Sequence, residues 1–133
     1  MKRFFAIFLA LLLLLPGCRA QNTDISMEDI VAAYEAVGYS VWSEVYDEKL
    51  GDGQSASIQA NHPDGGYIYF SFFETHEEAA ACKKEYYHPM AMGLFSIIFG
   101  QPSWIRWKVH GCVIAEYDDP NFYAVFEELL RGK

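Results

Sequence analysis

The first eighteen residues limit how much of this chain can belong to a fold. Lys2 and Arg3 are basic, and an unbroken apolar run follows from Phe4 to Leu15. A run of this length is too short to cross a hydrocarbon core of roughly 30 Å, which needs about 20 residues. A basic start followed by a short apolar run is typical of a signal peptide that is removed on export. The pattern therefore predicts that residues 1–17 take no part in the folded domain.

The residues after the apolar run indicate how the exported chain is held. Leu15-Pro16-Gly17-Cys18 resembles the bacterial lipobox, in which an apolar residue and two small residues precede a cysteine. The resemblance implies a diacylglycerol on the Cys18 thiol, cleavage before Cys18, and anchoring at the extracytoplasmic face of the cell membrane. Two or more acyl chains hold a protein there stably, at about 0.8 kcal/mol per buried CH₂. Cleavage after Ala20 would instead give a secreted soluble protein, and failure of cleavage would leave an uncleaved anchor.

Charge limits the kinds of partner that such a chain can have. It carries 10 basic and 18 acidic residues, and removal of the signal takes away two of the basic ones. Nucleic acid and anionic bilayer surfaces repel an acidic protein, so we expect neither as a broad partner. Residues 18–24 are mainly polar and predict a lipidated tether. Residues 25–133 have the length of one domain with a single core.

The cysteines leave one pairing to consider. If Cys18 carries lipid, Cys82 and Cys112 remain as an even pair in an exported chain. A bridge between them would close a loop of about 30 residues and contribute on the order of 3–4 kcal/mol. The alternative is that both are reduced, buried thiols that pack as small hydrophobic groups. Both possibilities remain open, because sequence spacing does not place the two Cβ atoms.

Helix signals occur at three places in the chain. Ser26 precedes an apolar pattern of helical spacing that ends at Gly38, with Asp29 in the position of a capping-box acid. A second capping box begins at Thr75 and predicts a helix to about Tyr87. Asp119 followed by proline predicts the start of a third helix, which Gly132 ends.

Strand signals fill the segments between these helices. The predicted strands are Tyr39–Tyr46, Ser55–Ala60, Tyr67–Phe73, Trp104–Val109 and Cys112–Tyr117. The second of them alternates, with Ala56, Ile58 and Ala60 on one face and small polar residues on the other. The order is therefore α-β-β-β-α-β-β-α. It predicts an α+β domain with an antiparallel sheet of about five strands and helices packed mainly on one face.

A family resemblance follows from several of these segments. Ala36-Val37-Gly38-Tyr39, Ile58-Gln59-Ala60, and the aromatic run Tyr67–Phe73 followed by Glu77-Glu78-Ala79 resemble small lipoproteins of Gram-positive gut bacteria. The resemblance covers roughly Met27 to Tyr87, with a weaker continuation to Leu130. It implies the layout of strands and helices given above, and it implies no activity, because that group has none assigned.

Catalytic and metal-binding patterns are missing from the sequence. The histidines are His62, His76, His88 and His110. No two of them have the spacing of a metalloprotease helix, and no phosphate-binding loop, nucleophile elbow or Cys-x-x-Cys occurs. His62 and Asp64 share a turn but are too few for a metal site, and Gly111 indicates a turn between His110 and Cys112. We therefore expect no catalytic residue, metal or cofactor. The alternative is an exported enzyme whose site is assembled from scattered residues.

A cluster of aromatic and basic residues near position 106 is one candidate for binding. On a strand, Trp104, Arg106 and Lys108 would share one face, and Trp107 would lie on the other. The first three form either an ordinary solvent-exposed face or an aromatic and cationic patch that contacts a protein or small ligand.

The apolar segment Met90–Phe99, which contains Phe95, is the other candidate. It either covers the sheet or docks on a partner or on the nearby bilayer. Together these observations predict an exported, lipid-anchored, non-catalytic domain that binds or interacts with something outside the cytoplasmic membrane.

Overall fold

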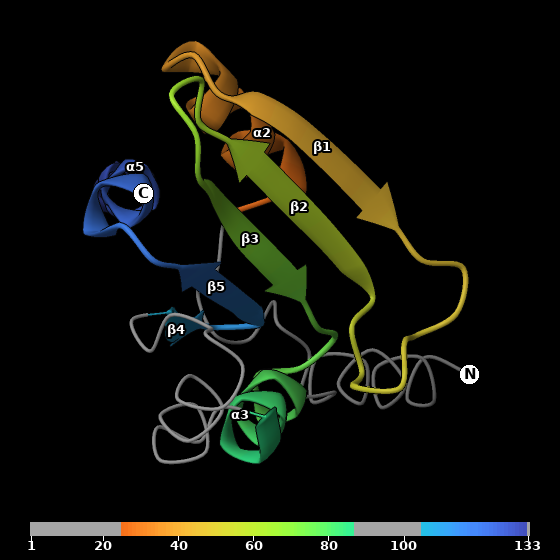
Figure 1. Cartoon of the computed structure of the whole chain (residues 1–133). Helices are drawn as coiled ribbons and strands as arrows, with labels where there is room; N and C mark the ends of the chain where they lie inside the picture. Colours follow the sequence, from red (N-terminus) through yellow and green to blue (C-terminus); the bar gives the residue numbers. More distant parts are fainter. Residues whose placement is uncertain (1–24, 87–104, 133) are drawn as a thin grey trace, which may run out of the picture.

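A computed structural model describes residues 25–86 and 105–132 of the chain (Figure 1). Its elements are α2 (Met27–Ala36), β1 (Ser40–Val45), β2 (Ala56–Asn61), β3 (Tyr67–Phe72), α3 (His76–Tyr86), β4 (Arg106–His110), β5 (Val113–Tyr117) and α5 (Pro120–Arg131). The predicted order and the α+β class are confirmed. The predicted signal and tether, and the segment Met90–Phe99, lie outside the described residues.

The helices begin where their capping residues indicate. At the start of α2, the Asp29 N–H donates to Ser26 Oγ at 3.1 Å, and the Ser26 N–H donates to Asp29 Oδ2 at 3.2 Å. Thr75 Oγ1 accepts a hydrogen bond from the Glu78 N–H at 3.1 Å, one residue before α3. Asp119 Oδ1 accepts from the Asn121 N–H at 2.9 Å at the start of α5. Each cap satisfies a backbone donor that the first helical turn leaves unpaired.

The strands form one antiparallel sheet in the order β1-β2-β3-β5-β4. Three of the ladders join strands that are neighbours in the chain, while β3 and β5 pair across the whole segment between them. Tight turns with positive φ make the hairpins possible, at Gly65 and Gly66 between β2 and β3 and at Gly111 between β4 and β5. Within the described residues, β1 and β4 are the edges of the sheet.

The larger core lies between the sheet and the helices α2 and α5. Its side chains include Ile30, Tyr34, Ile58, Phe70 and Phe126, which are fully buried or nearly so. Tyr34 also donates its hydroxyl hydrogen to the Phe122 carbonyl at 2.7 Å, which ties α2 to α5. Both helices turn apolar side chains at helical spacing toward this face of the sheet.

A smaller core lies on the other face, under α3. Phe73, Ala79, Cys82 and Ile114 are buried there, with Trp107 and other partly buried side chains packed against them. Helix α3 contacts β4 and β5, and Figure 1 shows it apart from α2 and α5. Two of the three described helices therefore share a face, as predicted, and α3 covers the opposite face only near its β4–β5 end. None of the described helices combines the length and apolar character required to cross a bilayer.

Candidate functional site

A row of five side chains crosses the face of the sheet that α2 and α5 leave uncovered. The strand registers pair Trp42 with Gln59, Gln59 with Tyr69, Tyr69 with Glu116, and Glu116 with Trp107. Residues paired directly across antiparallel strands project from the same face, with neighbouring strands about 4.8 Å apart. We call these five residues the cross-strand row. Aromatic and hydrogen-bonding side chains alternate along it.

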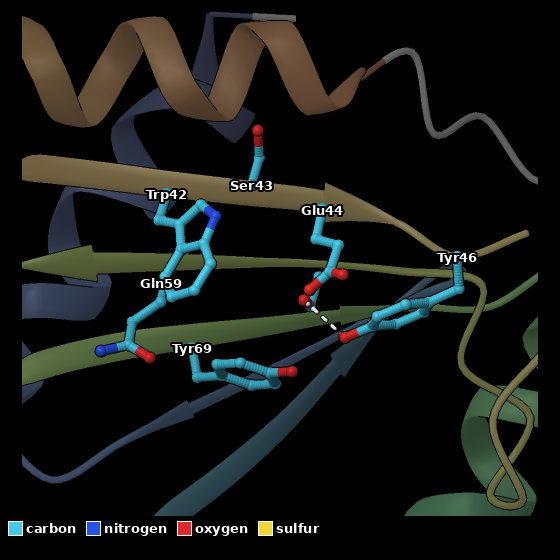
Figure 2. Close-up of a pocket in the computed structure, with 7 residues that line it drawn as sticks. Trp42, Ser43, Glu44, Tyr46, Gln59 and Tyr69 are labelled. Atoms are coloured by element: carbon cyan, nitrogen blue, oxygen red, sulfur yellow. Dashed lines mark hydrogen bonds between the residues drawn. The ribbon is translucent and has the colours of Figure 1, made fainter.

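A first cavity lies at the β1 end of the row. It has a volume of about 140 Å³ and is lined by Trp42, Ser43, Glu44, Tyr46, Ser57, Gln59 and Tyr69. Figure 2 shows Trp42, Glu44 and Gln59 on the same side of the sheet, while Ser43 points the other way. The Tyr46 and Ser57 hydroxyls are hydrogen-bonded at 2.8 Å (Figure 2). Trp42 is 71% exposed, so this end of the row is open to solvent.

A second cavity, of about 320 Å³, adjoins the first at Tyr69. Its other lining residues in the described part of the chain are Asp52, Gln54, Ser71, Cys82, Trp107, Ile114 and Glu116. They come from the loop between β1 and β2, from three strands and from α3, so no single stretch of sequence encodes the cavity. Its volume falls in the range of about 300–1,000 Å³ that small-molecule sites occupy.

Hydrogen bonds fix the polar wall of the second cavity. The Gln54 backbone N–H donates to Asp52 Oδ1 at 3.1 Å, and the Gln54 amide donates to the other Asp52 oxygen. The Tyr69 hydroxyl donates to Gln54 Oε1 at 3.5 Å, a long contact. These contacts orient the loop toward the strand that carries Tyr69, so the Asp52 carboxylate is held at the cavity rather than left to move freely.

The electrostatics of the second cavity centre on Glu116. Burial raises the pKa of its carboxyl, and a hydrogen bond from Trp107 opposes the rise. Burial also raises the pKa of the Tyr69 hydroxyl. Glu44, Asp52 and Glu116 are acidic, and none of the described residues that line either cavity is Lys, Arg or His. The pair of cavities is therefore acidic and aromatic.

The two described cysteines differ in their bonding. Cys82 is buried and free, and burial raises the pKa of its thiol, with Asp52 and Glu85 adding to the effect. Cys112 is disulfide-bonded, whereas Cys82 is not. The structure has no bridge between Cys82 and Cys112, and of the two reduced, buried thiols in the alternative interpretation only Cys82 is one. A buried thiol with a raised pKa is a poor nucleophile.

The predicted aromatic and cationic patch is described only in part. Arg106 and Lys108 are exposed on β4, on the face opposite to Trp107. Lys108 Nζ lies 4.6 Å from the centre of the Tyr123 ring. Trp104 and Phe95 lie outside the described residues, so partner binding by this patch stays a prediction. Trp107, on the other face of β4, packs against the smaller core and also lines the second cavity.

The described histidines serve local structure. Nδ1 of His62 accepts from the Asp64 N–H at 3.1 Å, and its ring stacks on Phe122. Nδ1 of His76 lies 2.7 Å from the Gly111 carbonyl, and the His110 ring meets Phe126 edge-on. Among residues 25–86 and 105–132, no group of three or more possible metal ligands comes together.

Sequence reasoning missed Trp42, Asp52 and Glu116 as site residues. The alternation within β2 was a usable signal for the site, since it placed polar side chains on one face of the sheet. No signal within a short stretch of sequence predicts that β3 pairs with β5, and that pairing is what brings Glu116 beside Tyr69. Comparison with other proteins adds no further guide, because the chain matches no protein-family model, no curated protein and no solved structure.

Proposed function

We propose that this chain is an exported, lipid-anchored protein of the cell envelope whose domain binds a small ligand at the cross-strand row without catalysing a reaction. The observation that carries the binding role is the second cavity. It holds a carboxyl of raised pKa between two aromatic side chains, on the face of the sheet opposite to the larger core. Perturbed acids in clefts are found more often at functional sites than elsewhere.

Support for export and anchoring comes from the N-terminal residues. The basic Lys2 and Arg3, the apolar run and Leu15-Pro16-Gly17-Cys18 are arranged as in a lipoprotein signal. A tether of residues 18–24 would hold the binding domain close to the membrane. The alternative is a secreted soluble domain that begins after Ala20.

Intact mass of the protein from its native membrane fraction tests the anchor, beside a Cys18→Ala variant. The expected mass is that of residues 18–133 plus an addition the size of diacylglycerol, and the variant should lack the addition. An unmodified chain that begins at Gln21 would contradict the proposal. A Cys18 found in a disulfide by peptide mapping without reduction would also contradict it, because one sulfur cannot carry both a thioether and a disulfide.

Nuclear magnetic resonance tests the binding site. The ¹⁵N-labelled protein is held in a polyoxyethylene detergent, which has neither sugar nor charge, and is titrated with mixtures of sugars, amino acids, organic acids and organic cations. We expect shifts in the amides of β2, β3 and β5 and in the Trp42 and Trp107 indoles. Shifts confined to α2 and α5, or no shifts with any mixture, would contradict a ligand site on the cross-strand row.

A second candidate function is an exported enzyme. The observation that favours it is the presence of Glu116 and Asp52 in one cavity. A carboxyl of raised pKa can donate a proton while a second carboxylate stays ionised. Turnover of a panel of chromogenic esters and glycosides that is lost in Glu116→Gln would favour the enzyme over the binding domain.

A further inference from the structure

We propose that the second cavity binds an organic cation, a protonated or quaternary amine, between the carboxylates of Glu116 and Asp52 and against the aromatic side chains of Tyr69 and Trp107. The inference rests on the proposed function, because it names the class of ligand for the same site. It makes a narrower claim, which can fail while a small-ligand site at the cross-strand row stands.

The charges around the cavity argue for a cation. Asp52 and Glu116 line it, Glu44 lines the adjoining cavity, and no described lining residue is basic. The nearest basic residue in the loop that carries Asp52 is Lys49, which is engaged by Glu74 at 2.8 Å and Glu78 at 3.0 Å. An anion would therefore be repelled, and a neutral ligand would leave Glu116 without a counter-charge.

The aromatic side chains argue for an organic cation. Tyr69 and Trp107 flank Glu116 in the register, one on each neighbouring strand. Side chains directly opposite each other on antiparallel strands have Cβ atoms about 5 Å apart, so a cation at the Glu116 carboxylate would have both aromatic side chains as neighbours. Trp and Tyr are the rings that attract cations best, and quaternary ammonium groups are the ligands most often held this way.

The size of the cavity argues against a bare metal ion. A volume of about 320 Å³ is much larger than an ion with its ligands needs. Metal sites also need three or more converging ligands, and the described residues supply no such group. A methylated or alkyl ammonium would fill the space while its weakly hydrated charge meets the carboxylates.

Because Glu116 is partly buried, the affinity of the cavity for a cation should depend on pH. The groups that face it are Asp52 from the β1–β2 loop, Tyr69 from β3, Cys82 from α3 and Trp107 from β4. Tyr69 and Cys82 have raised pKa values and stay neutral, so Asp52 is the other charge. A bound cation favours the ionised form of Glu116 and lowers its pKa. Binding therefore releases a proton, and affinity falls as pH falls through the pKa of the free protein.

Titration with choline, compared with 3,3-dimethylbutan-1-ol, tests the inference. The two molecules have the same shape, and only choline is charged. We expect choline to shift the Trp107 indole and the β5 amides in the detergent-held protein, and to bind at least about tenfold more tightly than the neutral alcohol.

Acid-to-amide variants test which carboxylates hold the cation. Glu116→Gln keeps the shape of the side chain and should weaken choline about tenfold and remove most of the pH dependence. Asp52→Asn should weaken it less, because Asp52 lies in the loop between β1 and β2 and is only half-buried. Glu35→Gln removes an exposed acid from α2, on the opposite side of the sheet, and should change nothing.

Three results would overturn the inference. They are equal binding of the neutral alcohol, unchanged choline affinity in both Glu116→Gln and Asp52→Asn, and no choline binding at all. If sugars or acids still shift the cross-strand row in those cases, the proposed binding role survives with another ligand class. If no mixture shifts it, the proposed function fails as well.

Discussion

At the scale of single residues, Glu116 links stability to pH. Burial raises the pKa of its carboxyl above the ordinary value of 4.5. The folded state favours the protonated carboxyl, whereas the unfolded chain ionises more readily. The contribution of Glu116 to the free energy of unfolding is therefore largest below pH 4.5, and it is lost as pH rises through the folded-state pKa. Glu116→Gln should then become more stable relative to the natural protein as pH rises. Urea unfolding of both proteins at about pH 3.5 and about pH 7 measures the change, and a stability difference that does not vary with pH would refute it.

Two adjacent glycines allow the cost of backbone strain to be separated from the cost of a steric clash. Gly65 and Gly66 both have positive φ, of +101° and +86°. A Cβ at Gly66 would lie 2.7 Å from the Phe122 ring, whereas a Cβ at Gly65 would meet nothing within 4 Å. Gly65→Ala should cost about 1 kcal/mol of backbone strain. Gly66→Ala should cost about 1–3 kcal/mol more, since Phe122 must move. Thermal and urea unfolding would show equal losses if the contact with Phe122 does not matter.

At the scale of elements, one buried hydrogen bond joins α2 to α5. Tyr34→Phe removes the hydroxyl that donates to the Phe122 carbonyl at 2.7 Å and keeps the ring in the core. We expect a loss of about 1–2 kcal/mol in the free energy of unfolding. Tyr67→Phe is the control, because Tyr67 is 47% exposed, and its loss should stay within about 0.5 kcal/mol. A Tyr34→Phe variant as stable as this control would show that the bond contributes nothing net.

The elements were predictable to the extent that local chemistry specifies them. Ser26, Thr75 and Asp119 mark helix starts by satisfying backbone donors nearby, and the structure confirms all three. The alternation in Ser55–Ala60 placed its apolar face correctly. The site was not predictable in the same way. Glu116 becomes a neighbour of Tyr69 only through the pairing of β3 with β5, and sequence-local signals do not encode such a distant register.

At the scale of the whole molecule, the described helices cover the two faces of the sheet unequally. Helices α2 and α5 cover the larger core, while α3 covers a smaller one at the β4–β5 end. The cross-strand row begins under α3, at Trp107, and ends at the exposed Trp42. Among the described elements, β1 and α3 bury fewer or smaller apolar side chains than the central strands, so their local stability should be lower.

Native-state hydrogen exchange should reveal this gradient. The strand β3 is paired on both sides and buries Ile68 and Phe70, so its amides should exchange only through global unfolding. The edge strand β1 and the helix α3 have fewer buried side chains, and their hydrogen-bonded amides should exchange at least about tenfold faster, through partial opening. Exchange followed in increasing low denaturant would separate the two routes, because only global opening depends strongly on denaturant. If α3 and β1 amides showed the same rates and the same denaturant dependence as β3, the two cores would unfold as one unit, and the smaller core would be no weaker than the larger one.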